Sequence, residues 1–190
     1  MMERVFDTIL SAIQGHPKRP LRVAIDGGSA SGKTTLANRL GEVLNCPVVH
    51  MDDFFLPSEL RSAERLQEPG GNVHYERFAA EVLPGLRTGE GFSYGIFDCS
   101  TLTVTGQREI PANDIIIVEG AYSLHPALAD VYDLKILLRV DPKLQAKRIL
   151  SRNGPEKQAV FLAKWIPLEH RYFEGCHVQA RADLILDIEA

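Results

Sequence analysis

The stretch that most constrains the fold runs from residue 21 to residue 36, LRVAIDGGSASGKTTL. It opens with a short apolar run containing β-branched residues, which is typical of a buried strand in a parallel sheet. Gly27 and the sequence Gly32-Lys33-Thr34 then fit the pattern G-x-x-x-x-G-K-[ST], the phosphate-binding P-loop. Glycines let successive backbone N–H groups converge on one centre, and the following helix adds its positive end. The stretch therefore predicts a nucleotide-binding site.

Two side chains of this motif have specific expected roles. Lys33 is expected to reach the outer phosphates of a bound nucleotide, and the Thr34 hydroxyl is expected to bind Mg²⁺. The other residues of the loop, and the residue after Thr34, are expected to surround the phosphates. The predicted nucleotide-binding residues of this stretch are Gly27, Gly28, Ser29, Ala30, Ser31, Gly32, Lys33, Thr34 and Thr35.

Composition narrows the class of protein further. A chain of 190 residues that is 45% hydrophobic and 24% charged is ordinary for a globular domain with a sizeable core. The net charge of −4 gives no general electrostatic reason to bind nucleic acid. The longest apolar run, residues 159–163, is far too short to cross a membrane, and no signal peptide is visible. We therefore expect a cytoplasmic protein with neither nucleic-acid nor membrane partners, for which a homo-oligomer stays open.

The three cysteines give no sign of a disulfide framework or a zinc site. Cys46, Cys99 and Cys176 lie far apart in the sequence, and none belongs to a C-x-x-C pair. We expect them to be small core residues.

Strand and helix patterns alternate along the rest of the chain. Strands are expected at 21–25, 48–50, 115–119, 134–140 and 182–186. Helices are expected at 1–15, 33–44, 75–86, 142–153 and 157–174. This order predicts an α/β fold of the P-loop NTPase type, with a doubly wound, mostly parallel sheet and helices on both faces. We expect a single domain spanning residues 1–190.

Two regions are expected to stand outside this sheet. Residues 58–105 form a substrate-side insert, in which 58–71 is polar and predicts a mobile segment with one helical turn. Residues 89–105 alternate weakly in hydrophobicity and predict a small hairpin beside the main sheet. Residues 143–174 are expected to form a helical lid, broken at Gly154-Pro155.

Carboxylates follow two of the predicted strands. Asp52 and Asp53 come directly after the strand at 48–50, where ligands bind in an open α/β sheet. We favour Asp52 as the base that accepts a proton from a substrate hydroxyl, and as a water-mediated Mg²⁺ ligand. Asp53 competes for the role, and both residues could instead be capping or turn residues. Glu119 ends the buried run at 115–118, which predicts a second carboxylate at the Mg²⁺ site.

Basic residues lie on the first predicted lid helix. Arg148 and Arg152 are four residues apart and therefore share one helical face. Phosphoryl transfer needs positive charge near the transferred oxygens, which a lid carrying arginines supplies. We predict a catalytic role for Arg148 and a nucleotide-binding role for Arg152, and a solvated basic face explains the pattern equally well.

The segments DGGSASGKTTL, MDDFFLP, FDC and IIIVEG, in this order and spacing, resemble the uridine kinase and phosphoribulokinase family of P-loop kinases. The resemblance extends from about Arg22 to Asp187. It implies Asp52 as the catalytic base, since residues 52–55 match the family's D-S-F-Y run with two substitutions. It further implies that Glu119 and Arg148 match the family's Glu-Gly strand end and its basic helix. The implied activity is transfer of the γ-phosphate of ATP, with Mg²⁺, to a hydroxyl of a small metabolite.

The predicted hairpin departs from the uridine kinases. In those enzymes an aromatic-Asp-aromatic run is followed closely by a histidine and an arginine that help to read the pyrimidine. Here Phe97-Asp98-Cys99 is followed by no basic residue before Arg108. We therefore expect uridine and cytidine to be poor substrates, and a nucleoside-like, sugar or vitamin-like hydroxyl compound to be the acceptor. The residues expected to contact this acceptor are His74, Tyr75, Tyr94, Asp98 and Arg171.

Other functions are compatible with the same motifs. One is a nucleotide-binding regulatory ATPase or GTPase without a small-molecule acceptor. The absence of an N-K-x-D guanine motif and the presence of the insert argue against it. Two further alternatives are a true uridine/cytidine kinase and a kinase of another P-loop branch that acts on pantothenate, gluconate or a nucleotide.

Overall fold

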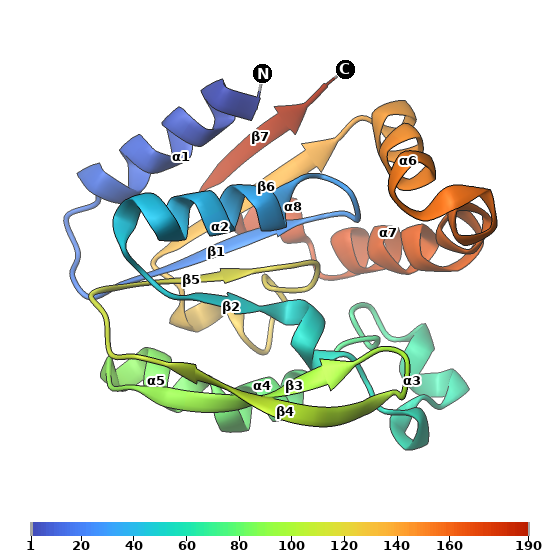
Figure 1. The fold of residues 1–190 in the computed structure, drawn as a ribbon, viewed down its shortest axis with the longest axis horizontal. Helices are drawn as coiled ribbons and strands as arrows, with labels where there is room; N and C mark the ends of the chain where they lie inside the picture. Colours follow the sequence, from blue (N-terminus) through green and yellow to red (C-terminus); the bar gives the residue numbers. More distant parts are fainter. Residues whose placement is uncertain (1, 190) are drawn as a thin grey trace.

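The structure, a computed structural model, describes residues 2–189 and is built around one five-stranded sheet. The strand order is β2-β5-β1-β6-β7, and every pair of neighbours is parallel (Figure 1). The strands are β1 (Leu21–Gly27), β2 (Val48–His50), β5 (Ile115–Glu119), β6 (Leu134–Val140) and β7 (Leu184–Ile188). The α/β P-loop NTPase fold predicted from the sequence is confirmed.

The most apolar strands take the central positions. All seven residues of β1 are buried, because both faces of this strand are covered. β5 lies between β1 and β2, so that Glu119 is in register with Ile25 on one side and with His50 on the other. The carboxylate that ends β5 is therefore placed directly beside the strand that leads into the P-loop.

Helices cover both faces of the sheet, as the doubly wound fold requires. On one face α1 (Met2–Gly15) and α2 (Lys33–Leu44) pack against alternate residues of β1, such as Val23 and Ile25. On the other face lie α4 (Tyr75–Glu81), α5 (Leu83–Thr88), α7 (Ile166–Gly175) and α8 (Val178–Arg181). The buried side chains of α1 recur at helical spacing, as predicted, and are Val5, Phe6, Ile9 and Ile13.

Within the insert between β2 and β5, the β-hairpin lies beyond the β2 edge of the sheet (Figure 1). Residues 51–71 contain three short helical segments, η1 (Met51–Phe54), η2 (Ser58–Leu60) and α3 (Ala63–Gln67). The predicted helix at 75–86 is divided at Val82, because Pro84 has no N–H to continue the first helix and instead occupies the first turn of α5. The predicted hairpin is present as β3 (Phe92–Asp98) and β4 (Thr103–Ile110), which form a separate two-stranded sheet.

The region predicted to form a lid, residues 143–174, is helical and consists of α6 (Pro142–Val160), a π-helical segment (Phe161–Trp165) and α7. Asp141 caps the start of α6 by accepting hydrogen bonds from the backbone N–H groups of Lys143 and Leu144. Gly154, at φ 79°, interrupts α6 where a break was expected. These helices lie at the end of the sheet where β1 leads into the P-loop (Figure 1).

No helix within residues 2–189 is long and apolar enough to cross a membrane. The expectation that all three cysteines are core residues is wrong for Cys99, which is exposed in the turn of the β3–β4 hairpin, whereas Cys176 is buried.

Candidate active site

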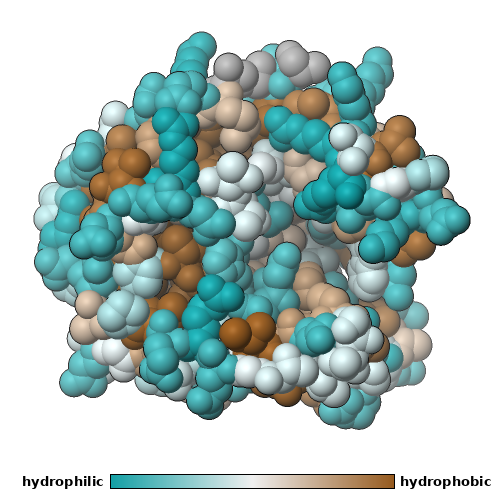
Figure 2. Space-filling view, viewed as in Figure 1, coloured by the Kyte–Doolittle hydropathy of each residue, from teal (hydrophilic) through white to brown (hydrophobic). Residues whose placement is uncertain are grey.

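A cavity of about 810 Å³ opens between the P-loop, the lid and the hairpin. Figure 2 shows the molecule hollowed on this side, between the lid helices and the hairpin. The volume is within the usual range for small-molecule sites. The lining residues are Met2, Ser29, Ala30, Gly32, Lys33, Thr34, Thr35, Asp52, Phe55, Arg61, Asn72, Cys99, Leu102, Ala121, Tyr122, Arg148, Ser151, Arg152, Phe161, Trp165 and Glu169.

The P-loop has the geometry expected of a phosphate cradle. Gly32 precedes α2 with φ 96°, a conformation that a side chain would strain. The Lys33 side chain is buried against the loop, and its Nζ donates to the carbonyl oxygen of Gly28 over 3.3 Å. The hydroxyl of Ser31 is buried and has no hydrogen-bond partner among the described residues. A poorly paired ammonium group beside the loop fits a bound phosphate chain, whereas the predicted contacts Gly27, Gly28 and Ser31 do not line the cavity.

The lid is attached to this loop by polar contacts. The carboxylate of Glu169 on α7 accepts the backbone N–H of Ser29 over 3.0–3.1 Å and also accepts its hydroxyl. Gln145 on α6 donates to the carbonyl oxygen of Ser29 over 2.9 Å. Burial raises the pKa of Glu169, although Ser29 and Lys33 oppose the shift. A loop that already binds a carboxylate through a backbone N–H and a hydroxyl is chemically suited to an anion.

Both lid arginines line the cavity, as their shared helical face predicted. Arg148 donates from Nη1 to the carbonyl oxygens of Ala30 and Ser31 over 3.0 and 3.1 Å. Arg152 donates to the side chain of Asn153. Positive charge is therefore present on the lid side of the loop.

Two of the three expected Mg²⁺ residues, Thr34 and Glu119, are in contact, and the third, Asp52, lines the cavity. The Thr34 hydroxyl donates to one carboxylate oxygen of Glu119 over 3.1 Å, and Nδ1 of His50 lies 2.7 Å from the other. Glu119 is buried behind Thr34 and does not itself line the cavity. Within residues 2–189 no group of three or more His, Cys, Asp and Glu side chains could enclose a metal. A hydroxyl backed by a carboxylate fits Mg²⁺, which takes its remaining ligands from phosphates and water.

The two neighbouring aspartates point in different directions. Asp52 faces the cavity, where the surrounding protein raises its pKa by displacing water, and nearby Lys33 opposes the shift. Asp53 is buried on the hairpin side, with Oδ2 3.7 Å from Nε of Arg108. Of the two, only Asp52 is placed to meet a ligand in the cavity.

None of the five residues expected to contact the acceptor lines the cavity. Tyr94 is only 1% exposed, and its hydroxyl accepts the backbone N–H of His50. Tyr75 stacks on His125 with 4.5 Å between ring centroids. These two aromatic rings pack against other residues of the protein. The sequence patterns did not indicate this role.

The other three expected acceptor residues also have local structural roles. His74 precedes α4, and its backbone N–H donates to the carbonyl oxygen of Phe54. Asp98 accepts from the backbone N–H and the hydroxyl of Ser100 in the hairpin turn, and Arg171 donates to the carbonyl oxygen of Leu66. The acceptor side of the cavity is lined instead by Phe55, Arg61, Asn72, Cys99, Leu102 and Tyr122.

Sequence reasoning also missed two buried carboxylates next to the P-loop. One is Glu169, which carried no recognisable signal because its partner lies far away in the chain. The other is Asp26, which is fully buried and accepts hydrogen bonds from Gly27, Leu124 and Tyr172. An acid that directly follows the apolar run 23–25 and precedes the P-loop glycines is the signal that could have identified Asp26.

The chain resembles known kinases in sequence and in fold. No family model matches the chain. The uridine/cytidine kinase UKL1, chloroplastic, of Arabidopsis thaliana is 27% identical over 151 residues, which cover 74% of this chain and 31% of that protein. The uridine kinase of Limosilactobacillus reuteri is 25% identical over 189 residues, which cover 89% of this chain and 84% of that one. The chain thus spans about a third of the length of the plant relative.

Solved structures are similar over nearly the whole chain. A possible uridine kinase from Bacillus stearothermophilus gives a TM-score of 0.74 at 24% identity, over 98% of this chain and all of that one. A candidate fructose transport system kinase from Silicibacter sp. TM1040 gives a TM-score of 0.71 at 23% identity, over 95% and 98% of the two chains.

Fold and loop together define a P-loop kinase fold. Within that class, the resemblance to uridine kinases and uridine kinase-like proteins noted in the sequence is confirmed by the relatives.

Proposed function

We propose that this protein is an ATP-dependent kinase that transfers the γ-phosphate to a hydroxyl group of a small metabolite. The observation that carries the proposal is that Lys33 of the P-loop and Asp52 line one cavity. A phosphate-binding ammonium group and a carboxylate base that share a site are the two elements that such a reaction needs. The similarity to uridine kinases supports the same activity.

In this proposal the chain's residues divide the work between binding and proton transfer. The P-loop N–H groups and Lys33 hold the β- and γ-phosphates, and the guanidinium group of Arg152 faces the transferred phosphoryl group from the lid. Arg148 is held beside the loop by the carbonyl oxygens of Ala30 and Ser31. Thr34, backed by Glu119, holds the metal. Bound Mg²⁺ would supply positive charge to the phosphate oxygens.

Asp52 has the position of a general base. It takes the proton of the acceptor hydroxyl while that oxygen forms a bond to the γ-phosphorus, and the bond from the γ-phosphorus to the β,γ-bridging oxygen breaks to release ADP.

The acceptor wall suggests the class of substrate. Asn72 is only 5% exposed, and its side-chain oxygen has no hydrogen-bond partner among the described residues. Arg61 is fixed through Nε to the carbonyl oxygen of Leu56 over 2.7 Å, which leaves its terminal nitrogens toward ligands. Phe55 and Tyr122 add aromatic surface. We propose a compact polyhydroxylated or nucleoside-like acceptor held by these groups.

The test is a phosphate-transfer screen. Release of ADP from ATP and Mg²⁺ is measured alone and with pools of nucleosides, sugars and vitamins, for the wild type and for Lys33→Ala. We expect turnover that depends on one pool and is abolished in the variant, with the thermal midpoint of the variant close to that of the wild type. Turnover that no pool stimulates would favour a regulatory ATPase instead. Activity of the variant within a few-fold of the wild type would contradict the role of the loop.

A further inference from the structure

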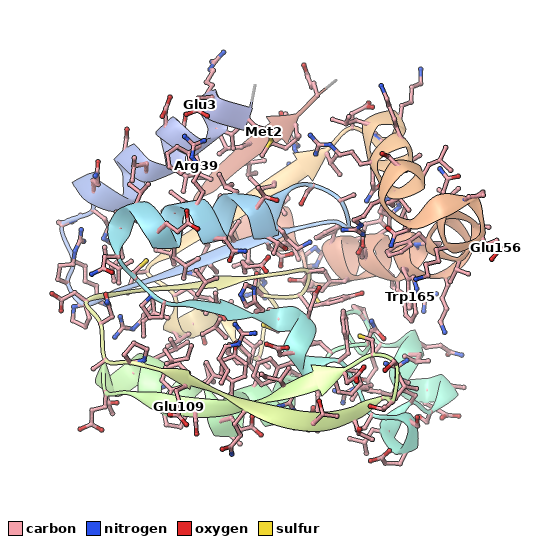
Figure 3. All side chains as sticks on the ribbon, in the orientation of Figure 1. Met2, Glu3, Arg39, Glu109, Glu156 and Trp165 are labelled. Carbon is pink, nitrogen blue, oxygen red and sulfur yellow. The ribbon has the colours of Figure 1, made fainter. Side chains whose placement is uncertain are left out.

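The N-terminal helix reaches the nucleotide cavity. Met2, the first residue of α1, lines this cavity although it lies outside every motif of the sequence. Its terminal methyl carbon would be 3.2 Å from a Cβ atom built on Gly32, the residue before Lys33. Figure 3 shows Met2 at the start of α1, above the end of α2 that adjoins the P-loop.

The sheet order shows which end of the cavity Met2 occupies. The P-loop follows β1, the central strand, and Asp52 follows β2 at one edge of the sheet. Because the γ-phosphate must point toward Asp52, the base of the nucleotide must extend from the loop in the other direction, toward β6 and β7. The core that contains α1 includes residues of β1, β5, β6 and β7, and Figure 1 shows α1 beside β7, with α2 over the middle of the sheet, so α1 lies on that side.

Arg148 lies near the same part of the loop as Met2. Its Nη1 would lie 3.8 Å from the same Cβ position on Gly32, so the Met2 and Arg148 side chains both lie over this loop residue. Thr35 and Ser151 complete this part of the wall. It offers an apolar, polarisable surface and a planar cation, which suit the face and edge of a purine ring.

We infer that Met2 forms a wall of the nucleotide-base subsite, so that α1 completes the ATP site from outside the P-loop motif. The inference rests on the proposed function, since it assumes a nucleotide in this cavity. The thioether packs against the base and makes no contact with the phosphates.

The position of α1 does not depend on Met2. Val5, Phe6, Ile9 and Ile13 bury the helix in the core. Glu3 accepts two hydrogen bonds of 2.6 Å from Arg39 on α2, and the Arg39 guanidinium carbon lies 3.8 Å from the ring centroid of Phe6 (Figure 3). Replacing Met2 should therefore leave the helix in place.

The experiment compares binding of ATP with binding of inorganic tripolyphosphate by calorimetry, both in the presence of Mg²⁺. Proteins are the wild type, Met2→Ala, Met2→Leu and, as a control on the same helix, Glu3→Gln. We expect Met2→Ala to weaken ATP binding about two- to tenfold, the range for loss of a sulfur–aromatic contact. Tripolyphosphate affinity should not change, Met2→Leu should bind ATP more nearly like the wild type, and Glu3→Gln should bind both ligands normally.

Three results would overturn the inference. They are equal ATP affinity in Met2→Ala and the wild type, an equal loss for ATP and tripolyphosphate, and failure of the wild type to bind ATP at all. The proposed function fails differently, when the wild type binds ATP with the expected Met2 dependence but transfers phosphate to no acceptor.

Discussion

Glu169 on α7 binds Ser29 in the P-loop twice, through the backbone N–H and through the hydroxyl. The carboxylate is only 4% exposed, so these contacts are shielded from bulk water. Hydrogen bonds to a charged acceptor are about twice as strong as neutral ones. The pair therefore links the lid to the loop and keeps Ser29 in one position.

Glu169→Gln should weaken ATP binding more than catalysis. An amide has one oxygen that can accept and an NH₂ group that cannot, so at least one contact with Ser29 is lost. We expect the KM for ATP to rise about tenfold, equivalent to about 1.4 kcal/mol, with little change in kcat. Steady-state kinetics would check this, with Glu174→Gln on the exposed side of the same helix as the control. A lower KM would show instead that the carboxylate competes with phosphate for the N–H of Ser29.

The two neighbouring aspartates should differ sharply in kinetics. Because Asp52 faces the cavity, Asp52→Asn should lower kcat by about 10²–10⁴-fold with little change in ATP binding. Asp53 is turned toward Arg108, so Asp53→Asn should cost much less activity. The measurements are turnover and ATP affinity of both variants. The reverse ranking would show that Asp53, and not Asp52, is the base.

Glu119→Gln should change the dependence on Mg²⁺. The Glu119 carboxylate accepts the Thr34 hydroxyl and adds negative charge beside the proposed metal site. An amide removes this charge, so a higher Mg²⁺ concentration should be needed for half-maximal rate, while the rate at saturating Mg²⁺ falls less. Titration of activity with Mg²⁺ at fixed ATP measures both quantities. An unchanged titration would leave Glu119 with a purely structural role.

The fold could be predicted because its signals are local. The apolar runs of β1 and β5 and the glycines of the P-loop lie in contiguous sequence, and their burial and loop geometry follow from those residues. Glu169 could not be predicted in the same way, because its role depends on how α7 packs against a loop at the other end of the chain. The division of residues 75–86 at Val82 was not predicted, although Pro84 is a local signal for it.

The residues that face the acceptor could not be predicted for the same reason. Asp98 and Tyr94 belong to segments that approach the cavity, but each side chain is held by a neighbour, Ser100 or His50, instead of facing it. Which side of a short strand or turn faces a ligand is decided by contacts between segments that sequence patterns do not encode.

Asp26 should make stability depend on pH. Burial raises its pKa to about 6, against the opposing effect of Tyr172, Leu124 and Gly27, which donate to the carboxylate. An aspartate in the unfolded chain titrates near pH 3.9. Between about pH 4 and pH 6 the folded state therefore binds the extra proton. The stability from this group is complete below pH 4 and falls as the pH rises through 6.

Tyr172→Phe should enlarge this effect. The Tyr172 hydroxyl stabilises the ionised form of Asp26, so its loss raises the pKa further and costs more stability at pH 8 than at pH 5. We expect a loss of about 1.5–3 kcal/mol at pH 8, measured by urea unfolding at both pH values. Tyr132→Phe is the matched control, because the buried hydroxyl of Tyr132 has no partner among residues 2–189 and its removal should cost nothing. An equal loss for Tyr172→Phe at both pH values would contradict the proposed link.

Uridine and cytidine should be poor substrates. The turn of the hairpin contributes only Cys99 and Leu102 to the cavity, and neither side chain is a strong hydrogen-bond donor for a base. Arg108, the nearest cation on the hairpin, lies against Asp53 instead. A pyrimidine read by hydrogen bonds loses about 1–3 kcal/mol for each polar atom that is buried unpaired.

Two such losses would lower kcat/KM by about 10²-fold or more. We therefore expect kcat/KM for both nucleosides to fall below about 10⁴ M⁻¹s⁻¹, the low end for ordinary enzymes. Steady-state kinetics with ATP and each nucleoside provide the test, and Arg61→Ala serves as the comparison. A value above that limit that collapses in Arg61→Ala would show that the segment after β2, and not the hairpin, reads the base, and that this protein is a true uridine/cytidine kinase.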